Sequence, residues 1–218
     1  MAGGVVHITG AAGVGASTLG RYLSRLLGRV HLDTDDFYWA PTDPPYQVKY
    51  APDHRVARLR EAIRAAGPCG CVLSGSLDGW GDALIGTFDV VVFLRVPTAI
   101  RLVRLRQREL QRHGADALAP GGAMYDRHRS FMTWAAAYEA ETMPGRSLLR
   151  HEAWLLELSC PIVRLDGTLP VPVLAEAVCC TLGGSPLGGS PLKVSLTTPR
   201  DPARQIGGAG RDAVRKSA

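Results

Sequence analysis

A chain of 218 residues with 46% hydrophobic content can bury one sizeable core and is too short for two. Its longest apolar runs span about five residues, far below the ~20 that a membrane-spanning helix needs. The first residues show no signal-peptide pattern, so we expect a cytoplasmic protein. Residues 183–218 hold six Lys/Arg against two Asp/Glu and so carry most of the net charge of +5, which argues against a nucleic-acid-binding surface on the nearly neutral remainder.

The five cysteines and six histidines are scattered along the chain. The cysteines form an odd set without C-x-x-C motifs, which is atypical of both a disulfide framework and a zinc ribbon. We therefore expect free, mostly buried thiols and no metal site built from protein side chains alone.

Short apolar runs alternate with helical patterns through residue 182, which is typical of a parallel sheet covered by helices on both faces. The pattern predicts an α/β fold with a doubly wound, five-stranded parallel sheet in three α/β/α layers. The predicted strands are residues 4–9, 29–33, 70–74, 88–95 and 161–165.

The first strand leads through a glycine-rich turn to a helix, because Leu19, Leu23, Leu26 and Leu27 repeat with helical spacing. Further helices are predicted at residues 51–66, 97–112, about 124–138 and 147–158. The glycine- and proline-containing segment 113–123 lies between two of these helices and is predicted to be a mobile lid.

The composition changes after residue 182. Gly-Gly-Ser-Pro-Leu occurs at residues 183–187 and again at 188–192, and no apolar periodicity follows. Such a segment cannot bury enough surface to offset its ordering entropy. We expect residues 1–182 to form the folded domain and residues 183–218 to be a disordered basic tail, the one segment where contact with nucleic acid has any support.

The turn between the first strand and the first helix carries the most chemical information. Gly10, Gly15 and Ser17 match the Walker A pattern G-x-x-x-x-G-K-[ST] in register, whereas Ala16 occupies the lysine position. Backbone N–H groups of such a loop bind phosphate oxygens, and the Ser17 hydroxyl is the predicted Mg²⁺ ligand. An ordinary tight turn rich in Gly and Ala is the alternative interpretation. The predicted nucleotide-binding residues are Gly10, Ala11, Ala12, Gly13, Val14, Gly15, Ala16, Ser17 and Thr18.

Asp33, Asp35 and Asp36 follow the second predicted strand. In open α/β sheets ligands bind at the carboxyl ends of the strands, so these acids are expected to face the phosphate site. Capping of the next segment by aspartate would explain the same residue types.

These motifs resemble the adenylate kinase and shikimate kinase branch of P-loop proteins. More narrowly, the chain resembles a bacterial group, often labelled ATP-binding or adenylate kinase-like, whose Walker A loop has a small residue in place of lysine. The matching segments are residues 10–18, 33–36, 39–45, 74–82 and 121–125. The resemblance implies a P-loop kinase-like fold from residue 5 to about residue 180, and it implies ATP as cofactor.

The resemblance also implies roles for acidic and turn residues. Asp33 would contribute to Mg²⁺ through water, and Asp35 would contact the acceptor hydroxyl. Gly75 and Ser76 resemble an acceptor-binding turn, with Asp78 as a weaker candidate.

An acceptor pocket is also expected near the second strand. Asp36 and Trp39 are its predicted substrate-binding residues, and Tyr46 and Trp80 could form further walls. Packing in the core would explain the aromatic residues equally well.

Arginines recur at spacings of three, four and four along one face of the predicted helix that leads into the lid. They are Arg101, Arg104, Arg108 and Arg112. Kinases of this branch place lid arginines over the transferring phosphate, so Arg104 and Arg108 are predicted to be catalytic. A solvated helix face is the alternative, and Arg127 and Arg129 are second choices.

Two further candidates lie outside these motifs. Asp166 and Gly167 follow the last predicted strand and resemble the turn that borders adenine, although an ordinary turn explains them as well. Lys49 is the only lysine outside the tail. Because the loop lacks its cation, we expect Lys49 to close toward the phosphates when acceptor binds, with a solvated surface lysine as the alternative.

The sequence thus predicts a Mg²⁺-dependent enzyme that transfers the terminal phosphoryl group of ATP to a small molecule or nucleotide. Ala16 keeps open the alternative of a nucleotide-binding regulator with little or no turnover. A nucleic-acid-binding protein ranks last because it depends on the tail alone.

Overall fold

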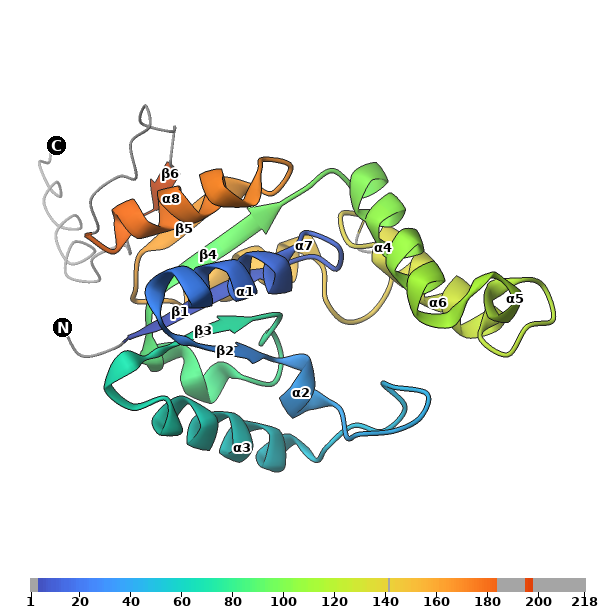
Figure 1. Cartoon of the computed structure of the whole chain (residues 1–218), viewed down its shortest axis with the longest axis horizontal. Helices are drawn as coiled ribbons and strands as arrows, with labels where there is room; N and C mark the ends of the chain where they lie inside the picture. The colour runs from blue at the N-terminus through green and yellow to red at the C-terminus, as the bar shows by residue number, and fades with distance from the viewer. Residues whose placement is uncertain (1–3, 141, 184–194, 198–218) are drawn as a thin grey trace, which may run out of the picture.

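A six-stranded sheet forms the centre of the computed structural model, which describes residues 4–140, 142–183 and 195–197 (Figure 1). The strand order is β2-β3-β1-β4-β5-β6. The five parallel strands are β1 (Val5–Gly10), β2 (Val30–Asp33), β3 (Cys71–Ser74), β4 (Phe88–Arg95) and β5 (Ile162–Asp166). They confirm the predicted five-stranded parallel sheet, and each boundary lies within one residue of the expected position.

The edge of the sheet differs from the prediction. β6 (Ser195–Thr197) pairs antiparallel with β5, so that Leu196 lies opposite Val163. These three residues belong to the segment that the sequence predicts to be disordered, and the prediction is wrong there. A three-residue edge strand held by backbone pairing is too short to show an apolar period. Residues 184–194 and 198–218 of the expected tail lie outside the described residues.

Helices cover both faces of the sheet, as predicted. The helices are α1 (Ala16–Leu27), α2 (Asp35–Tyr38), α3 (Pro52–Ala65), α4 (Thr98–His113), α5 (Ala115–Leu118), α6 (Tyr125–Ala136), α7 (Leu148–Leu156) and α8 (Val171–Thr181). Two 3₁₀ helices, Gly67–Cys69 and Asp82–Thr87, flank β3. None of the helices in this described part is long and apolar enough to cross a membrane.

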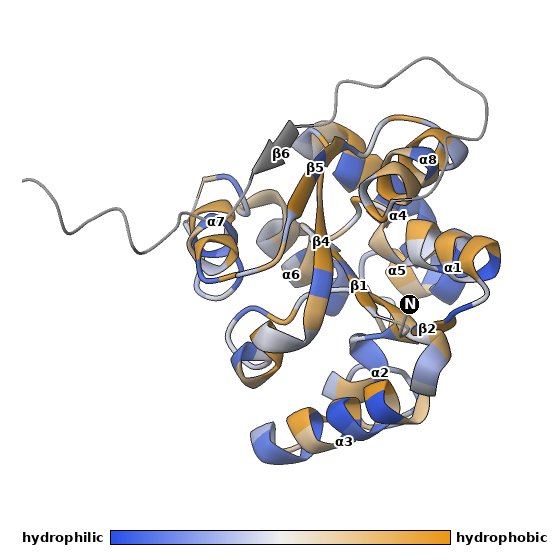
Figure 2. Ribbon diagram, turned by 90° about the vertical axis from the view of Figure 1, so that its left-hand side faces the viewer, coloured by the Kyte–Doolittle hydropathy of each residue, from blue (hydrophilic) through white to orange (hydrophobic). Residues whose placement is uncertain are grey.

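The core has two layers because successive strand residues point to opposite faces of the sheet. Val6 and Ile8 of β1 pack with residues of α1 and α8, whereas Val5 packs with residues of α3 and α7. Figure 2 shows the hydrophobic strands at the centre and the mixed, amphipathic colouring of the surrounding helices. Because these strands are parallel, their carboxyl ends lie together at one edge of the sheet.

A helical arm extends beyond those carboxyl ends (Figure 1). It consists of α4, α5 and α6, and Leu105, Met132 and Ala135 pack together within it. The predicted lid, residues 113–123, contains the short helix α5 and joins α4 to α6. Its mobility stays a prediction.

Candidate functional site

The loop between β1 and α1 has the shape that binding a phosphate requires. Gly13 and Gly15 have φ angles of 85° and 96°, a region that glycine adopts without strain. The side chains of Ala11 and Val14 are buried in the core, which fixes the loop to the domain. No side chain caps the N-terminus of α1, so its first N–H groups are available to an anion and the helix dipole favours one.

Ser17 and Asp33 meet beside this helix N-terminus. The Ser17 hydroxyl donates a hydrogen bond to Asp33 Oδ2 over 2.6 Å. Asp33 also accepts from the Asp35 backbone N–H (3.1 Å) and from the Ser74 hydroxyl (3.5 Å). The structure thus brings the two predicted metal ligands together and orients the carboxylate through β3 and α2. Thr18, next to Ser17, is exposed.

The short helix α2, which the sequence patterns did not predict, places Asp35 and Asp36 in its first turn. Both are exposed. Desolvation and then the charge of Asp33 raise the pKa of Asp35, and the same two causes raise the pKa of Asp36. The charges of Arg146 and Arg108 oppose the rise at Asp35, so both guanidinium groups act on this carboxylate.

Arg146 is a residue that sequence reasoning missed. It follows Gly145 in the connection between α6 and α7, and its Nη1 lies 3.5 Å from the carbonyl oxygen of Gly10, the first glycine of the loop. The two residues are 136 positions apart, and no local motif marks Arg146. A glycine–arginine turn just before a predicted helix was the only available signal.

The four arginines of the predicted stripe lie in four different environments. Arg101 is completely buried and pairs with Glu139 at 2.6 Å. Arg104 donates to the carbonyl of Gly167 (3.1 Å) and to that of Val14 (3.4 Å). Arg108 bonds its neighbour Glu109 (3.1 Å). Arg112 lies 5.1 Å from the ring centroid of Tyr46, and Arg127 and Arg129 are exposed.

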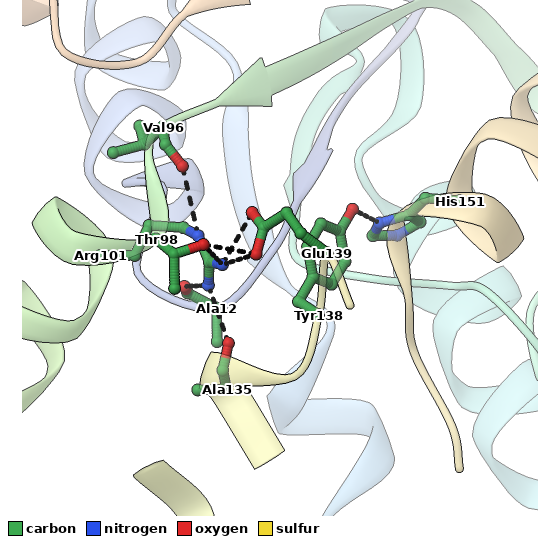
Figure 3. A network of polar contacts seen from close by, with 8 residues as sticks. All are labelled: Ala12, Val96, Thr98, Arg101, Ala135, Tyr138, Glu139 and His151. Carbon is green, nitrogen blue, oxygen red and sulfur yellow. Dashed lines mark hydrogen bonds and ion pairs between the residues drawn. The ribbon is translucent and has the colours of Figure 1, made fainter. Parts of the chain in front are cut away.

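Arg101 ties the loop to the helical arm. Its guanidinium donates to the carbonyls of Ala12 (3.1 Å) and Ala135 (3.2 Å), in addition to the ion pair with Glu139 (Figure 3). A solvated helix face is therefore not the environment of this residue. The contacts give Arg101 a role in positioning the loop rather than in contacting a ligand.

A buried network joins Tyr138 to His151 (Figure 3) and reaches Ser76 of the predicted acceptor turn. His151 Nδ1 lies 2.7 Å from the Tyr138 hydroxyl, and its Nε2 lies 3.2 Å from Ser76 Oγ and 3.4 Å from Thr9 Oγ1. Burial raises the pKa of Tyr138 and lowers the pKa of His151 to about 3, so the phenol stays protonated and the imidazole neutral. A neutral imidazole donates through one ring nitrogen and accepts through the other, so His151 can bond the Tyr138 hydroxyl on one side and hold the Ser76 hydroxyl on the other. Gly75, beside it, has no space for a side chain because a Cβ would overlap Thr34 Oγ1.

Aromatic rings line the connection between α2 and α3. The ring centroids of Tyr46 and Trp39 are 5.9 Å apart, those of Trp39 and Tyr38 5.0 Å, and those of Tyr38 and Trp80 5.6 Å. Lys49 is exposed, and its Nζ lies 5.5 Å from the rings of both Tyr38 and Trp39. The structure thus brings together the aromatic residues predicted for the acceptor pocket. The Lys49 ammonium group contacts these rings rather than the glycine loop.

The turn after β5 packs against the loop, and Arg104 bonds the carbonyls of both segments. Asp166 accepts hydrogen bonds from the backbone N–H and hydroxyl of Thr168. These bonds lower the pKa of Asp166. A Cβ on Gly167 would lie 3.0 Å from the carbonyl oxygen of Val14, so glycine permits the close approach.

A glycine loop between the first strand and an uncapped helix, at the carboxyl edge of a sheet of order 2-3-1-4-5, defines a P-loop α/β protein of the kinase-like type. A family model described as an AAA domain matches residues 6–117, just over half of the chain, and the chain belongs to this family. An uncharacterized protein of Bacillus subtilis (strain 168), YqaC, is 44% identical over 161 residues, which cover 74% of this chain and 87% of that protein.

The solved structure of a kinase shares the fold. Shikimate kinase from Acinetobacter baumannii superposes with a TM-score of 0.50 at 14% identity, over 83% of this chain and 94% of that chain. A sugar kinase from Janibacter sp. HTCC2649 gives a TM-score of 0.47 at 19% identity, over 84% and 96% of the respective chains. The match to shikimate kinase confirms the predicted fold class.

Proposed function

We propose that this protein is an ATP-dependent phosphotransferase that requires Mg²⁺ and acts on a small molecule or nucleotide. The Ser17–Asp33 hydrogen bond of 2.6 Å beside the uncapped N-terminus of α1 is the observation that carries the proposal. It joins the two oxygen groups that a metal–nucleotide complex needs at the place where backbone N–H groups meet phosphate. A cytoplasmic location, as expected from the sequence, would give such an enzyme access to ATP.

The chemistry of these residues fits a magnesium–nucleotide complex. Mg²⁺ usually keeps several waters and takes one or two protein oxygens plus phosphate oxygens. The described residues contain no cluster of three or more His, Cys, Asp and Glu side chains suited to a metal. Ser17 and Asp33 offer the one or two protein oxygens that Mg²⁺ needs when phosphate and water supply its other ligands. Bound Mg²⁺ would supply positive charge that neutralises the phosphate oxygens. The loop residues from Gly10 to Thr18 would hold and orient those oxygens.

On the acceptor side, Asp35 is the group best placed to accept the proton of an acceptor hydroxyl. Its raised pKa moves the carboxylate toward the range in which general bases work. Ser76, oriented by His151, and Gly75 would position the acceptor next to it. Asp36 and Trp39 would form the outer wall of the same pocket.

On the nucleotide side, the contacts of Arg104 with Val14 and Gly167 support a role in shaping the site for the base, together with Asp166. Arg108 acts electrostatically on Asp35, which supports its role near the transferring phosphate. Lys49 stays a candidate that would have to leave the rings of Tyr38 and Trp39. Membership of the bacterial group with a lysine-free loop is likewise part of this proposal.

A nucleotide-binding regulator with little turnover is the second candidate, and Ala16 is the observation that favours it. The experiment that separates the two begins with ligand-induced melting shifts across ATP, GTP, nucleoside monophosphates and common metabolites. ADP release is then measured with every compound that shifts the melting temperature. Acceptor-dependent ADP release supports the phosphotransferase, whereas tight ATP binding without turnover supports the regulator. A lack of any nucleotide-dependent shift would contradict both.

A further inference from the structure

The loop itself offers no cation to the phosphates. Ala16 stands where a lysine would carry a charge to the terminal phosphate oxygens. Backbone N–H groups can hold the oxygens and bound Mg²⁺ would neutralise part of their charge, but P-loop enzymes use a side-chain cation on the terminal phosphate in addition. A replacement must come from another part of the fold and must lie at the rim of the loop.

Arg146 lies at that rim. Its guanidinium donates to the carbonyl of Gly10, at the start of the loop, and lies 5.6 Å from the ring centroid of Trp134. The side chain is partly buried. Desolvation lowers the pKa of Arg146, and the nearby charge of Asp35 is the largest opposing influence, followed by Tyr138 and Asp78. Arginine stays protonated at any ordinary pH, so a partly desolvated positive charge faces the site.

The backbone around Arg146 is anchored on both sides. Ser147 caps α7 by accepting the backbone N–H of Arg150 at 3.3 Å. The N–H of Leu148 donates to the carbonyl of Tyr138 at 2.9 Å, and Tyr138 is itself held by His151. The backbone of Arg146 is therefore fixed, and the 3.5 Å contact with the Gly10 carbonyl holds the guanidinium at the loop, which favours a preorganised electrostatic contact.

We propose that Arg146 is the cation that replaces the missing loop lysine and binds the terminal phosphate oxygens of the nucleotide. The inference rests on the proposed function and adds to it the residue that supplies the charge. Without nucleotide the guanidinium is held by the Gly10 carbonyl and the charge of Asp35, and the terminal phosphate takes over this interaction. The planar fork of arginine can bind two oxygens at once, which a lysine cannot do.

The test compares the affinities of ATP and ADP, because only ATP carries the γ-phosphate that Arg146 is proposed to bind. Calorimetry with Mg²⁺ is performed on the wild type, Arg146→Ala, Arg146→Lys and the double variant Arg146→Ala/Ala16→Lys. We expect Arg146→Ala to weaken the binding of ATP by about 10- to 100-fold and the binding of ADP by much less, as loss of a charge-assisted contact implies. Arg146→Lys should retain part of the ATP preference, and Ala16→Lys should restore part of it in the alanine background.

Two variants serve as comparisons. Arg150→Ala removes an exposed arginine four positions away that pairs with Asp78, and it should leave the ratio of ATP to ADP affinity unchanged. Lys49→Ala tests the other candidate cation. The proposal is overturned when Arg146→Ala leaves the ratio at the wild-type value, when it weakens ATP and ADP equally, or when Lys49→Ala alone reduces the ratio. Failure of the wild type to bind ATP would instead contradict the proposed function.

Discussion

Ser17 and Asp33 are joined by a hydrogen bond of 2.6 Å although 16 positions separate them in the chain. The bond connects the first turn of α1 with the carboxyl end of β2. Parallel pairing of β2 with β3 and of β3 with β1 brings these two ends to one edge of the sheet. The contact between Ser17 and Asp33 is therefore a consequence of the strand order.

Substitution Ser17→Ala should weaken the Mg²⁺-dependent part of ATP binding. The loop N–H groups remain, so binding without Mg²⁺ should change little. Calorimetry with and without Mg²⁺ measures both parts. Ser24→Ala is the control, because this hydroxyl of the same helix donates to the carbonyl of Arg21, and its removal should leave both parts unchanged. Equal Mg²⁺ dependence in Ser17→Ala and wild type would remove Ser17 from the metal site.

The ion pair of Arg101 and Glu139 should stabilise the fold as a unit. Arg101 is completely buried and the Glu139 side chain is 36% exposed, so Glu139→Gln leaves a buried charge unpaired, whereas Arg101→Met leaves a carboxylate that water can reach. We expect Glu139→Gln to lower the free energy of unfolding by about 3 kcal/mol and Arg101→Met to lower it by less, both measured by urea denaturation. The loss of unfolding free energy in the double variant should be clearly smaller than the sum of the losses in the two single variants. Arg106→Ala, on the exposed face of α4, should stay within about 0.5 kcal/mol of wild type.

Much of the fold was predictable because its signals are local. The loop from Gly10 to Thr18 and the five apolar strands are contiguous in sequence, and the structure places them as expected. The burial of Arg101 was not predictable, because its partners Ala12, Ala135 and Glu139 lie in the loop, in α6 and just after α6. A spacing of three and four residues looks the same on a buried helix face and on a solvated one.

The contact of Arg146 with Gly10 and the network around His151 were missed for the same reason. The contacts of Arg146 with Gly10 and of His151 with Ser76 and Thr9 join residues at least 75 positions apart, and each depends on how α7 and the preceding connection pack against the sheet. A composition or spacing argument contains no information on such pairs. The β6 pairing was missed because it depends on an open strand edge of β5 rather than on any property of residues 195–197.

Acidification should destabilise the protein through two buried histidines. Burial lowers the pKa of His7 to about 4 and the pKa of His151 to about 3, whereas both would titrate near 6.5 in the unfolded chain. As the pH falls through 6.5, the unfolded chain gains protons that the folded protein cannot take up until about pH 4 or 3, so stability falls across that window. At pH 5 each histidine should contribute a loss of about 2 kcal/mol relative to neutral pH.

Urea denaturation between pH 5 and 7.5 measures this loss. The variants His7→Gln and His151→Gln should each remove part of the pH dependence, because glutamine does not titrate. His54→Gln, a change at an exposed histidine, is the control and should follow the wild-type profile. A wild-type pH dependence in both buried variants would show that other groups cause the loss.

Two truncations should distinguish the contribution of β6 to stability from that of the rest of the C-terminal segment. Deletion of residues 198–218 is expected to leave the melting temperature and ATP affinity nearly unchanged. Deletion of residues 184–218 also removes β6 and exposes the backbone edge of β5, so we expect a melting temperature lower by a few degrees and a tendency to associate through that edge. Calorimetric melting and light scattering measure the two effects. Identical melting of both truncated forms would show that the β6 pairing adds no stability.

Arg104 and Arg108 were predicted from one stripe to act together in catalysis, and their contacts predict different effects. Arg104 bonds the carbonyls of Val14 and Gly167, so Arg104→Ala should weaken ATP binding by about 10-fold and leave kcat close to wild type. Arg108 acts on Asp35 and is exposed, so its contact with Glu109 can be exchanged for one with the transferring phosphate. Arg108→Ala should then lower kcat by about 10² with a smaller change in ATP affinity, as for other preorganised charge contacts. Steady-state kinetics with the identified acceptor, together with calorimetry for ATP, measure this division, and Arg106→Ala serves as the control for loss of a positive charge on α4. A loss of kcat in Arg104→Ala as large as that in Arg108→Ala, at unchanged ATP affinity, would return Arg104 to the catalytic role that its spacing predicts.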